Sequence, residues 1–121
     1  MEAFEILKIA ANALNEKKAK ELTAVKIADL TVLSEYFLMC TANSSTQIRA
    51  FCDEVEEKLE EQGVTPHHIE GRATGWIVLD YGSVIVHIFG RNEREFYGLE
   101  KMWSDGEAVD LNDILISPEE E

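Results

Sequence analysis

The strongest constraint on the fold is a pair of apolar runs that meet at a two-residue break. Residues 76–81 read W-I-V-L-D-Y and residues 84–89 read V-I-V-H-I-F, with only Gly82-Ser83 between them. Two-residue connections of this composition favour the turns that join antiparallel strands. The segment therefore predicts a β-hairpin. The aromatic-rich stretch 91–103 that follows predicts a helix whose inner face carries Phe96, Leu99 and Trp103.

Two more strands are predicted upstream of the hairpin. Residues 22–29 alternate, with Leu22 and Ala24 on one side and Val25 and Ile27 on the other. Residues 36–41 form a nearly unbroken apolar run, Y-F-L-M-C-T. Such a run is typical of a central strand that is covered on both faces. A short strand is also expected over residues 67–70.

Two helices complete the predicted fold. The apolar spacing over residues 2–16 indicates an amphipathic helix, with an inner face of Phe4, Leu7, Ala11 and Leu14. A second helix is expected to begin after Ser44 and to end at Gly63, because Ser44 and Gln47 have capping-box spacing and glycine favours the left-handed cap. Its buried stripe is predicted to be Ile48, Phe51, Cys52, Val55 and Leu59, with glutamates 54, 56, 57, 60 and 61 facing water.

Strands interleaved with helices predict an α/β fold, and 121 residues fit one domain with one core. We place that domain, a mixed β-sheet flanked by helices, at residues 1–104. Residues 105–121 are expected to form an acidic C-terminal tail that is partly disordered. Leu111, Ile114, Leu115 and Ile116 in this tail could pack locally, whereas the last residues, Pro118 to Glu121, are expected to lack order.

The charge restricts the class of partner. The chain has 11 Lys and Arg against 24 Asp and Glu, a formal net charge of −13. So negative a surface repels phosphate, which argues against direct binding of nucleic acid or of anionic lipid. A tightly bound partner should therefore offer a basic or neutral protein surface.

The remaining compositional signals favour a cytoplasmic protein. Cys40 and Cys52 lack the spacing of a redox or zinc pair, and we expect both to be buried thiols. The N-terminus has no basic region of the kind that opens a secretory signal. No apolar run approaches the roughly 20 residues that a membrane span requires.

Candidate catalytic and metal-binding groups are few. His67 and His68 are adjacent, so on a strand or loop they point apart, and no third and fourth ligand is indicated. His87 lies within a strand and has no recognisable nucleophile motif beside it, which favours a structural or docking role. For Asp80 two interpretations stay open, a carboxylate that supports the turn and a charged anchor for a partner. We predict neither a metal nor a cofactor.

The aromatic residues instead suggest a binding surface. Buried Trp and Tyr need a partner for their N–H or O–H, so these residues favour interfaces with one wet edge. Trp76, Tyr81, Tyr97 and Trp103 cluster around the predicted hairpin and the following helix. Any one of them could belong to the core, but the cluster as a whole predicts a protein-docking surface.

The chain resembles the ribosomal silencing factor (RsfS, Iojap-like) family over most of its length, from about Phe4 to Trp103. Four ordered blocks carry the resemblance, at residues 29–50, 53–59, 76–89 and 96–103. They include W-I-V-L-D-Y-G-S-V-I-V-H-I-F and F-Y-G-L-E-K-M-W. The departures are Ser83 and Glu35, where the family usually has Asp, and Ala42, where Gly is frequent.

The resemblance implies an α/β fold related to nucleotidyltransferases, without catalysis. It also implies binding to the fourteenth protein of the large ribosomal subunit, which blocks joining of the small subunit and represses translation when nutrients are scarce. Carried over by motif, the expected partner-binding residues are Trp76, Leu79, Asp80, Tyr81, His87, Tyr97, Glu100 and Trp103.

Three other interpretations stay open at this point. An assembly factor for the large subunit would use the same surface. A nucleotidyltransferase would need paired carboxylates to hold metal, and the V-I-V-H that follows Gly82-Ser83 contains no such pair. A homodimer through the hairpin face is compatible with the sequence.

Overall fold

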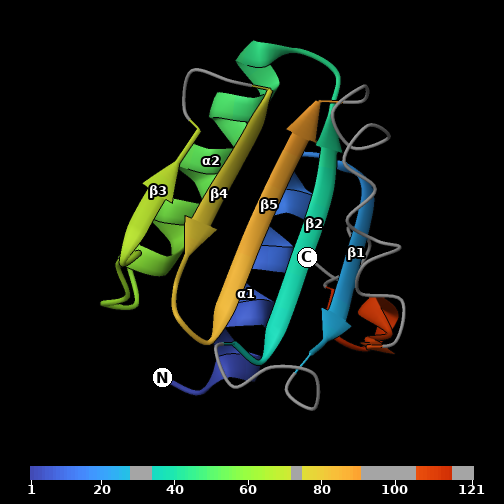
Figure 1. Cartoon of the computed structure of the whole chain (residues 1–121), viewed down its shortest axis with the longest axis vertical. Helices are drawn as coiled ribbons and strands as arrows, with labels where there is room; N and C mark the ends of the chain where they lie inside the picture. The colour runs from blue at the N-terminus through green and yellow to red at the C-terminus, as the bar shows by residue number, and fades with distance from the viewer. Residues whose placement is uncertain (28–33, 72–74, 91–105, 116–121) are drawn as a thin grey trace.

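The computed structural model describes residues 1–27, 34–71, 75–90 and 106–115. These residues form one mixed six-stranded sheet with two helices on one of its faces (Figure 1). The elements in chain order are α1 (Ala3–Glu16), β1 (Lys20–Lys26), β2 (Tyr36–Ala42), α2 (Ser45–Glu60), β3 (His68–Glu70), β4 (Trp76–Asp80), β5 (Val84–Gly90), β6 (Glu107–Ala108) and the 3₁₀ turn η1 (Leu111–Asp113).

The sheet has the strand order β3-β4-β5-β2-β1-β6. Only β2 and β5 pair in parallel, with Tyr36 opposite Val84, and all other neighbours are antiparallel. The predicted α/β class and mixed sheet are thus confirmed. The predicted helix over residues 91–103 lies outside the described residues, as do residues 116–121.

The main core lies between the sheet and the two helices. Alternate strand residues, among them Leu38 and Cys40 of β2 and Val86 and Ile88 of β5, pack against the buried sides of α1 and α2. The opposite side chains of β2 and β5 are buried too, with Met39 0% and Phe89 1% exposed. The prediction that residues 36–41 form a central strand covered on both faces is therefore confirmed.

Helix α2 follows its predicted pattern closely. The Ser44 Oγ accepts a hydrogen bond from the Gln47 N–H at 3.1 Å, and the Gln47 Oε1 accepts one from the Asn43 N–H at 2.6 Å. The reciprocal bond thus reaches one residue further back than in the usual capping box. Gly63 has φ +78°, the left-handed conformation expected after the helix. The buried residues of α2 are those predicted: Ile48, Phe51, Cys52, Val55 and Leu59.

Helix α1 departs from the prediction at one position. Leu7, Ala11 and Leu14 are buried as expected, but the side chain of Phe4 is 45% exposed and meets Tyr36 edge-on, with ring centroids 6.4 Å apart. The buried residues of α1 also include Ala3, which precedes Leu7 by one full turn. Phe4 is rotated about 100° from Ala3, which carries it to the edge of the buried stripe.

The acidic C-terminal segment contributes to the sheet and to the core. Strand β6 pairs with β1, an interaction that was not predicted, and Ile114 is buried in the main core. The Asn12 side-chain amide donates a hydrogen bond to the Ile114 carbonyl at 2.9 Å, which joins this segment to α1. The local packing expected for Leu111, Ile114 and Leu115 is confirmed, whereas the proposed domain boundary at residue 104 stays a prediction.

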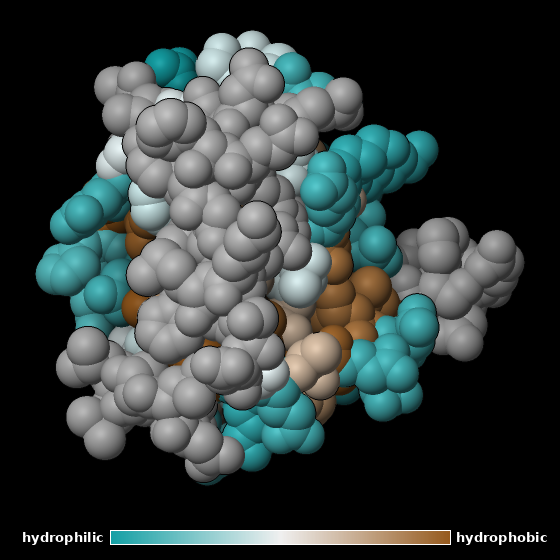
Figure 2. Space-filling model, turned by 45° about the vertical axis from the view of Figure 1, so that its right-hand side comes forward, coloured by the Kyte–Doolittle hydropathy of each residue, from teal (hydrophilic) through white to brown (hydrophobic). Residues whose placement is uncertain are grey.

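Charged and polar side chains cover much of the described surface. In the space-filling view, hydrophilic residues lie beside smaller areas of hydrophobic ones (Figure 2). Met1 and Phe4 are the large apolar side chains that are exposed within the described ranges. Within those ranges, neither helix combines the length and the apolar character needed to cross a bilayer.

Candidate binding surface on the β4–β5 hairpin

The predicted hairpin is present, and its turn has a defined structure. Gly82 adopts φ +82°, and the Ser83 N–H donates to the Tyr81 carbonyl at 3.1 Å, so the chain reverses through a tight three-residue turn. The Ser83 carbonyl accepts from the backbone N–H groups of Glu35 and Tyr36, and the Ser34 hydroxyl donates to the Gly82 carbonyl at 2.7 Å. The turn is therefore held against the start of β2.

Alternation along β4 divides its side chains between the two faces of the sheet. Ile77 and Leu79 are buried against the helices, with 1% and 0% exposed. Trp76, Val78 and Asp80 point to the opposite face and are half-buried. The partly exposed side chains of β4 therefore lie on this opposite face.

Trp76 is the outer member of an aromatic cluster that consists of Phe37, Trp76, His87 and Phe89. Its ring stacks on Phe89, which is its register partner, with centroids 5.2 Å apart and an interplanar angle of 24°. His87 stacks on Phe89 in turn, at 5.8 Å and 9°, and Phe37 meets His87 edge-on at 4.8 Å. The cluster spans three adjacent strands, so it fixes the orientation of the Trp76 ring.

His87 is the polar member of the cluster. Its Nδ1 accepts a hydrogen bond from the Trp76 Nε1–H at 3.2 Å, so in the neutral ring the proton sits on Nε2. Burial lowers the pKa of His87 to about 4, which keeps the ring neutral near pH 7. Nε2 is buried, and within the described part of the chain it has no hydrogen-bond partner. His87 therefore acts on the surface by holding Trp76, which agrees with the structural or docking role predicted for it.

Asp80 supports the turn, and its side chain is partly exposed. One carboxylate oxygen, Oδ1, accepts the Gly82 N–H at 2.8 Å and so supports the turn. The other, Oδ2, lies 3.7 Å from the His68 Nε2 on the neighbouring strand β3, and 31% of the Asp80 side chain is exposed. The turn-supporting interpretation is confirmed, and the exposed fraction leaves part of the carboxylate available to a partner.

The predicted site residues are only partly brought together. Trp76, Asp80 and His87 lie on one face of the hairpin, whereas Leu79 and Tyr81 belong to the core on the helix side. Motif matching could not separate these two groups, because the segment W-I-V-L-D-Y alternates between the faces. Tyr97, Glu100 and Trp103 lie outside the described residues.

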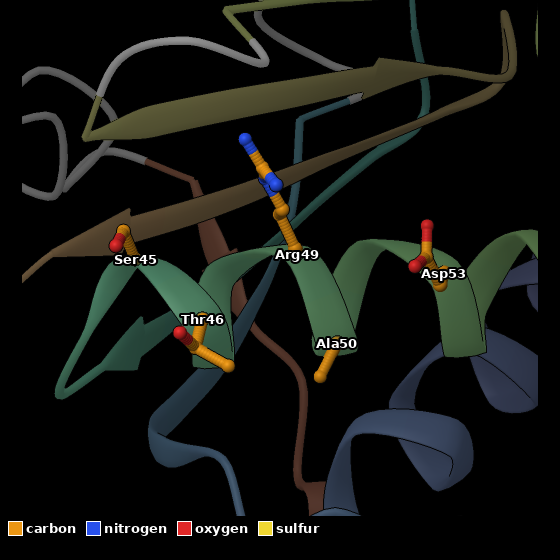
Figure 3. Close-up of a pocket in the computed structure, with 5 residues that line it drawn as sticks. All are labelled: Ser45, Thr46, Arg49, Ala50 and Asp53. Carbon is orange, nitrogen blue, oxygen red and sulfur yellow. The ribbon is translucent and has the colours of Figure 1, made fainter.

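The other candidate metal-binding and catalytic groups lie outside the aromatic cluster. His67 and His68 are both exposed, and in the described part of the chain neither joins a group of three metal-ligating side chains. A pocket of about 400 Å³ lies along α2, lined by Ser45, Thr46, Arg49, Ala50 and Asp53 (Figure 3). All five residues come from one helix, and Asp53 is the one carboxylate among them, so the pocket does not supply the paired carboxylates of a two-metal site.

One cluster of potential ligands escaped the sequence analysis. The ligand atoms of Cys52, Asp53 and Glu56 lie within 4.8 Å of one another, and the Cys52 thiol donates to the Glu56 Oε1 at 3.5 Å. We had assigned Cys52 to the core and Glu56 to the solvated face of α2. The spacing i, i+1, i+4 was the available signal, because residues four apart on a helix are neighbours.

Comparison with known proteins identifies the family. The model of a family described as "Ribosomal silencing factor during starvation" matches residues 1–121. The chain belongs to the ribosomal silencing factor family. It is 36% identical over 113 residues to the ribosomal silencing factor RsfS of Bacillus subtilis, covering 93% of this chain and 96% of that protein.

Other RsfS comparisons agree in sequence and in structure. The RsfS protein of Halalkalibacterium halodurans is 35% identical over 112 residues, which cover 92% of this chain and 96% of that one. A crystal structure of a protein from Chromobacterium violaceum superposes with a TM-score of 0.83 and 33% identity, covering 86% of this chain and 88% of that chain. The RsfS assignment therefore applies to the whole α/β domain, including the hairpin surface described above.

Proposed function

We propose that the protein silences the ribosome: it binds the fourteenth protein of the large subunit in the cytoplasm and sterically blocks joining of the small subunit. Membership of the ribosomal silencing factor family supports this proposal. We assign the binding surface to the hairpin because Trp76 is half-buried there, is oriented by Phe89 and His87, and lies on the same face as Asp80.

The physical properties of this surface suit a protein partner. A large ring held in one orientation loses little conformational entropy on binding, and tryptophan is enriched among residues that dominate binding energies. The net charge of −13 disfavours contact with rRNA phosphate and favours a basic protein surface. Leu79 and Tyr81 support the surface from within the core, while Trp76 and Asp80 meet the partner directly.

The mechanism requires no catalysis. Binding on the face of the large subunit that receives the small subunit competes with subunit joining, and the degree of repression follows from the two affinities and concentrations. We accordingly propose that the protein is not an enzyme. A role in assembly of the large subunit would use the same surface, and immature large subunits in a deletion strain would reveal it.

The test is a subunit-association assay on sucrose gradients. Purified large and small subunits are mixed in magnesium with and without the protein, and its sedimentation is followed by blotting. Silencing predicts that the protein travels with large subunits and that intact ribosomes fail to form. Normal ribosome formation with the protein left at the top of the gradient would overturn the proposal.

A pair of variants tests the surface itself. Trp76→Ala should weaken binding to the large subunit by about 2 kcal/mol, roughly 30-fold, if Trp76 dominates the interface. Phe4→Ala is the matched control, because Phe4 is an aromatic residue that is 45% exposed and lies on α1, in the layer behind the sheet. Equal affinities for wild type and a folded Trp76→Ala variant would remove Trp76 from the interface.

A further inference from the structure

The proposed function does not involve the cluster of Cys52, Asp53 and Glu56 on α2. Cys52 is fully buried, Glu56 is half-buried and Asp53 is exposed, so the three groups form a path from the core to solvent. Asp53 also lines the pocket along α2, where its carboxylate is open to solvent (Figure 3). A small ion can therefore reach the cluster without unfolding of the helix.

The spacing of the ligand atoms suits a tetrahedral zinc ion. With Zn–S near 2.3 Å and Zn–O near 2.0 Å, tetrahedral geometry places the sulfur and the oxygen about 3.5 Å apart. The Cys52 Sγ and the Glu56 Oε1 are 3.5 Å apart, and all three ligand atoms lie within 4.8 Å of one another. Rotation of the exposed Asp53 side chain can bring its carboxylate to the third position, and water can occupy the fourth.

The Tyr81 hydroxyl is an independent feature that points to the same place. Tyr81 is 5% exposed, and its hydroxyl has no hydrogen-bond partner among the described residues. A buried hydroxyl without a partner is uncommon and calls for an explanation. Burial is the main cause that raises the pKa of Tyr81, and electrostatic interactions with Glu56 and then Cys52 add to it, so Tyr81 lies within electrostatic range of the cluster.

We propose that Cys52, Asp53 and Glu56 bind one zinc ion, with the Tyr81 hydroxyl donating a hydrogen bond to a ligand carboxylate or to a zinc-bound water. The thiol must lose its proton when zinc binds. Its hydrogen bond to Glu56 provides the first acceptor, and the proton then passes to solvent, so one Zn²⁺ is taken up and one H⁺ is released. Outer hydrogen bonds of this kind orient the ligands and raise metal affinity.

The test uses Zn²⁺ and Co²⁺ with the purified full chain. Calorimetric titration with Zn²⁺ should show one site per chain, and Co²⁺ should give the ultraviolet charge-transfer band of a thiolate ligand. Glu56→Gln and Asp53→Asn, both at accessible positions that tolerate an amide, should each weaken Zn²⁺ binding at least 10-fold. Tyr81→Phe should weaken it by roughly 10-fold, the effect typical of an outer-shell partner.

Two matched controls separate the site from adventitious binding. Glu57→Gln removes an exposed acid of the same helix that is outside the cluster, and Cys40→Ala removes the other buried cysteine. Both variants should keep the affinity and the cobalt band. Absence of the thiolate band, or equal loss of affinity in Glu57→Gln and Glu56→Gln, would show an adventitious ion only and overturn the proposal. Ribosome binding and zinc binding are measured separately, so either can fail alone.

Discussion

Replacing His87 by phenylalanine should remove a large part of the pH dependence of folding. Burial lowers the pKa of His87 from its ordinary 6.5 to about 4. Between these values the unfolded state binds more protons than the folded state, so the free energy of unfolding falls as the pH falls. A difference of one pKa unit corresponds to 1.36 kcal/mol, which makes the whole effect about 3 kcal/mol below pH 4 and about 2 kcal/mol already at pH 5.

The assay is urea denaturation followed by circular dichroism at several pH values from 7 to 4. Phenylalanine keeps the aromatic contacts with Phe37 and Phe89 but cannot titrate. As the pH falls from 7 to 4, wild type should therefore lose about 3 kcal/mol of stability relative to His87→Phe. His68→Gln, a change at an exposed histidine, is the control for losing a histidine. Parallel pH profiles for wild type and His87→Phe would refute the buried, neutral ring.

Two further changes test the local structure that positions the hairpin and α2. Gly82→Ala should destabilise the fold by about 1–2 kcal/mol in urea denaturation, because φ is +82° and an alanine side chain is strained there. The added methyl group would lie 2.9 Å from the His67 ring, so this value holds if that ring rotates away. Gly63→Ala, at φ +78° with no atom within 4 Å of the added methyl group, is the control for backbone strain alone and should cost about the same. A much larger loss for Gly82→Ala would show that the ring is held in place. Ser44→Ala should cost about 1 kcal/mol because it removes the N-cap acceptor of the Gln47 N–H, while Ser45→Ala, one residue later, should have a far smaller effect in the same assay.

The family comparison and the geometry describe the protein at different levels of detail. The match over residues 1–121 establishes which family the chain belongs to. The structure distinguishes the hairpin side chains that reach the surface from those that support them. Trp76 and Asp80 reach the surface, and His87 lies beneath Trp76 as its hydrogen-bond acceptor. Variants at these positions should therefore affect binding and stability in different proportions.

Local patterns in the sequence were sufficient to predict most of the elements. The capping residue Ser44, the stripe from Ile48 to Leu59, the apolar run of β2 and the Gly82-Ser83 break each depend on interactions between residues close in the chain. Side-chain periodicity and turn chemistry act over a few residues, so they can be read without knowledge of the partner strands. Errors within the described helices, such as Phe4 on α1 and the half-buried Glu56 on α2, concern residues beside a buried stripe.

The tertiary structure decided which predicted residues share a surface. Pairing of β4 with β5 and of β5 with β2 stacks Trp76, Phe89, His87 and Phe37 across three strands, and these contacts join residues far apart in the sequence. The same is true of Tyr81, whose pKa is affected by Cys52 and Glu56, and of the pairing of β6 with β1. The sequence alone determined the elements, the acidity and the family resemblance, because these follow from local order and composition. Burial, pKa and the grouping of ligands depend on what lies across the sheet, and only the fold determines that.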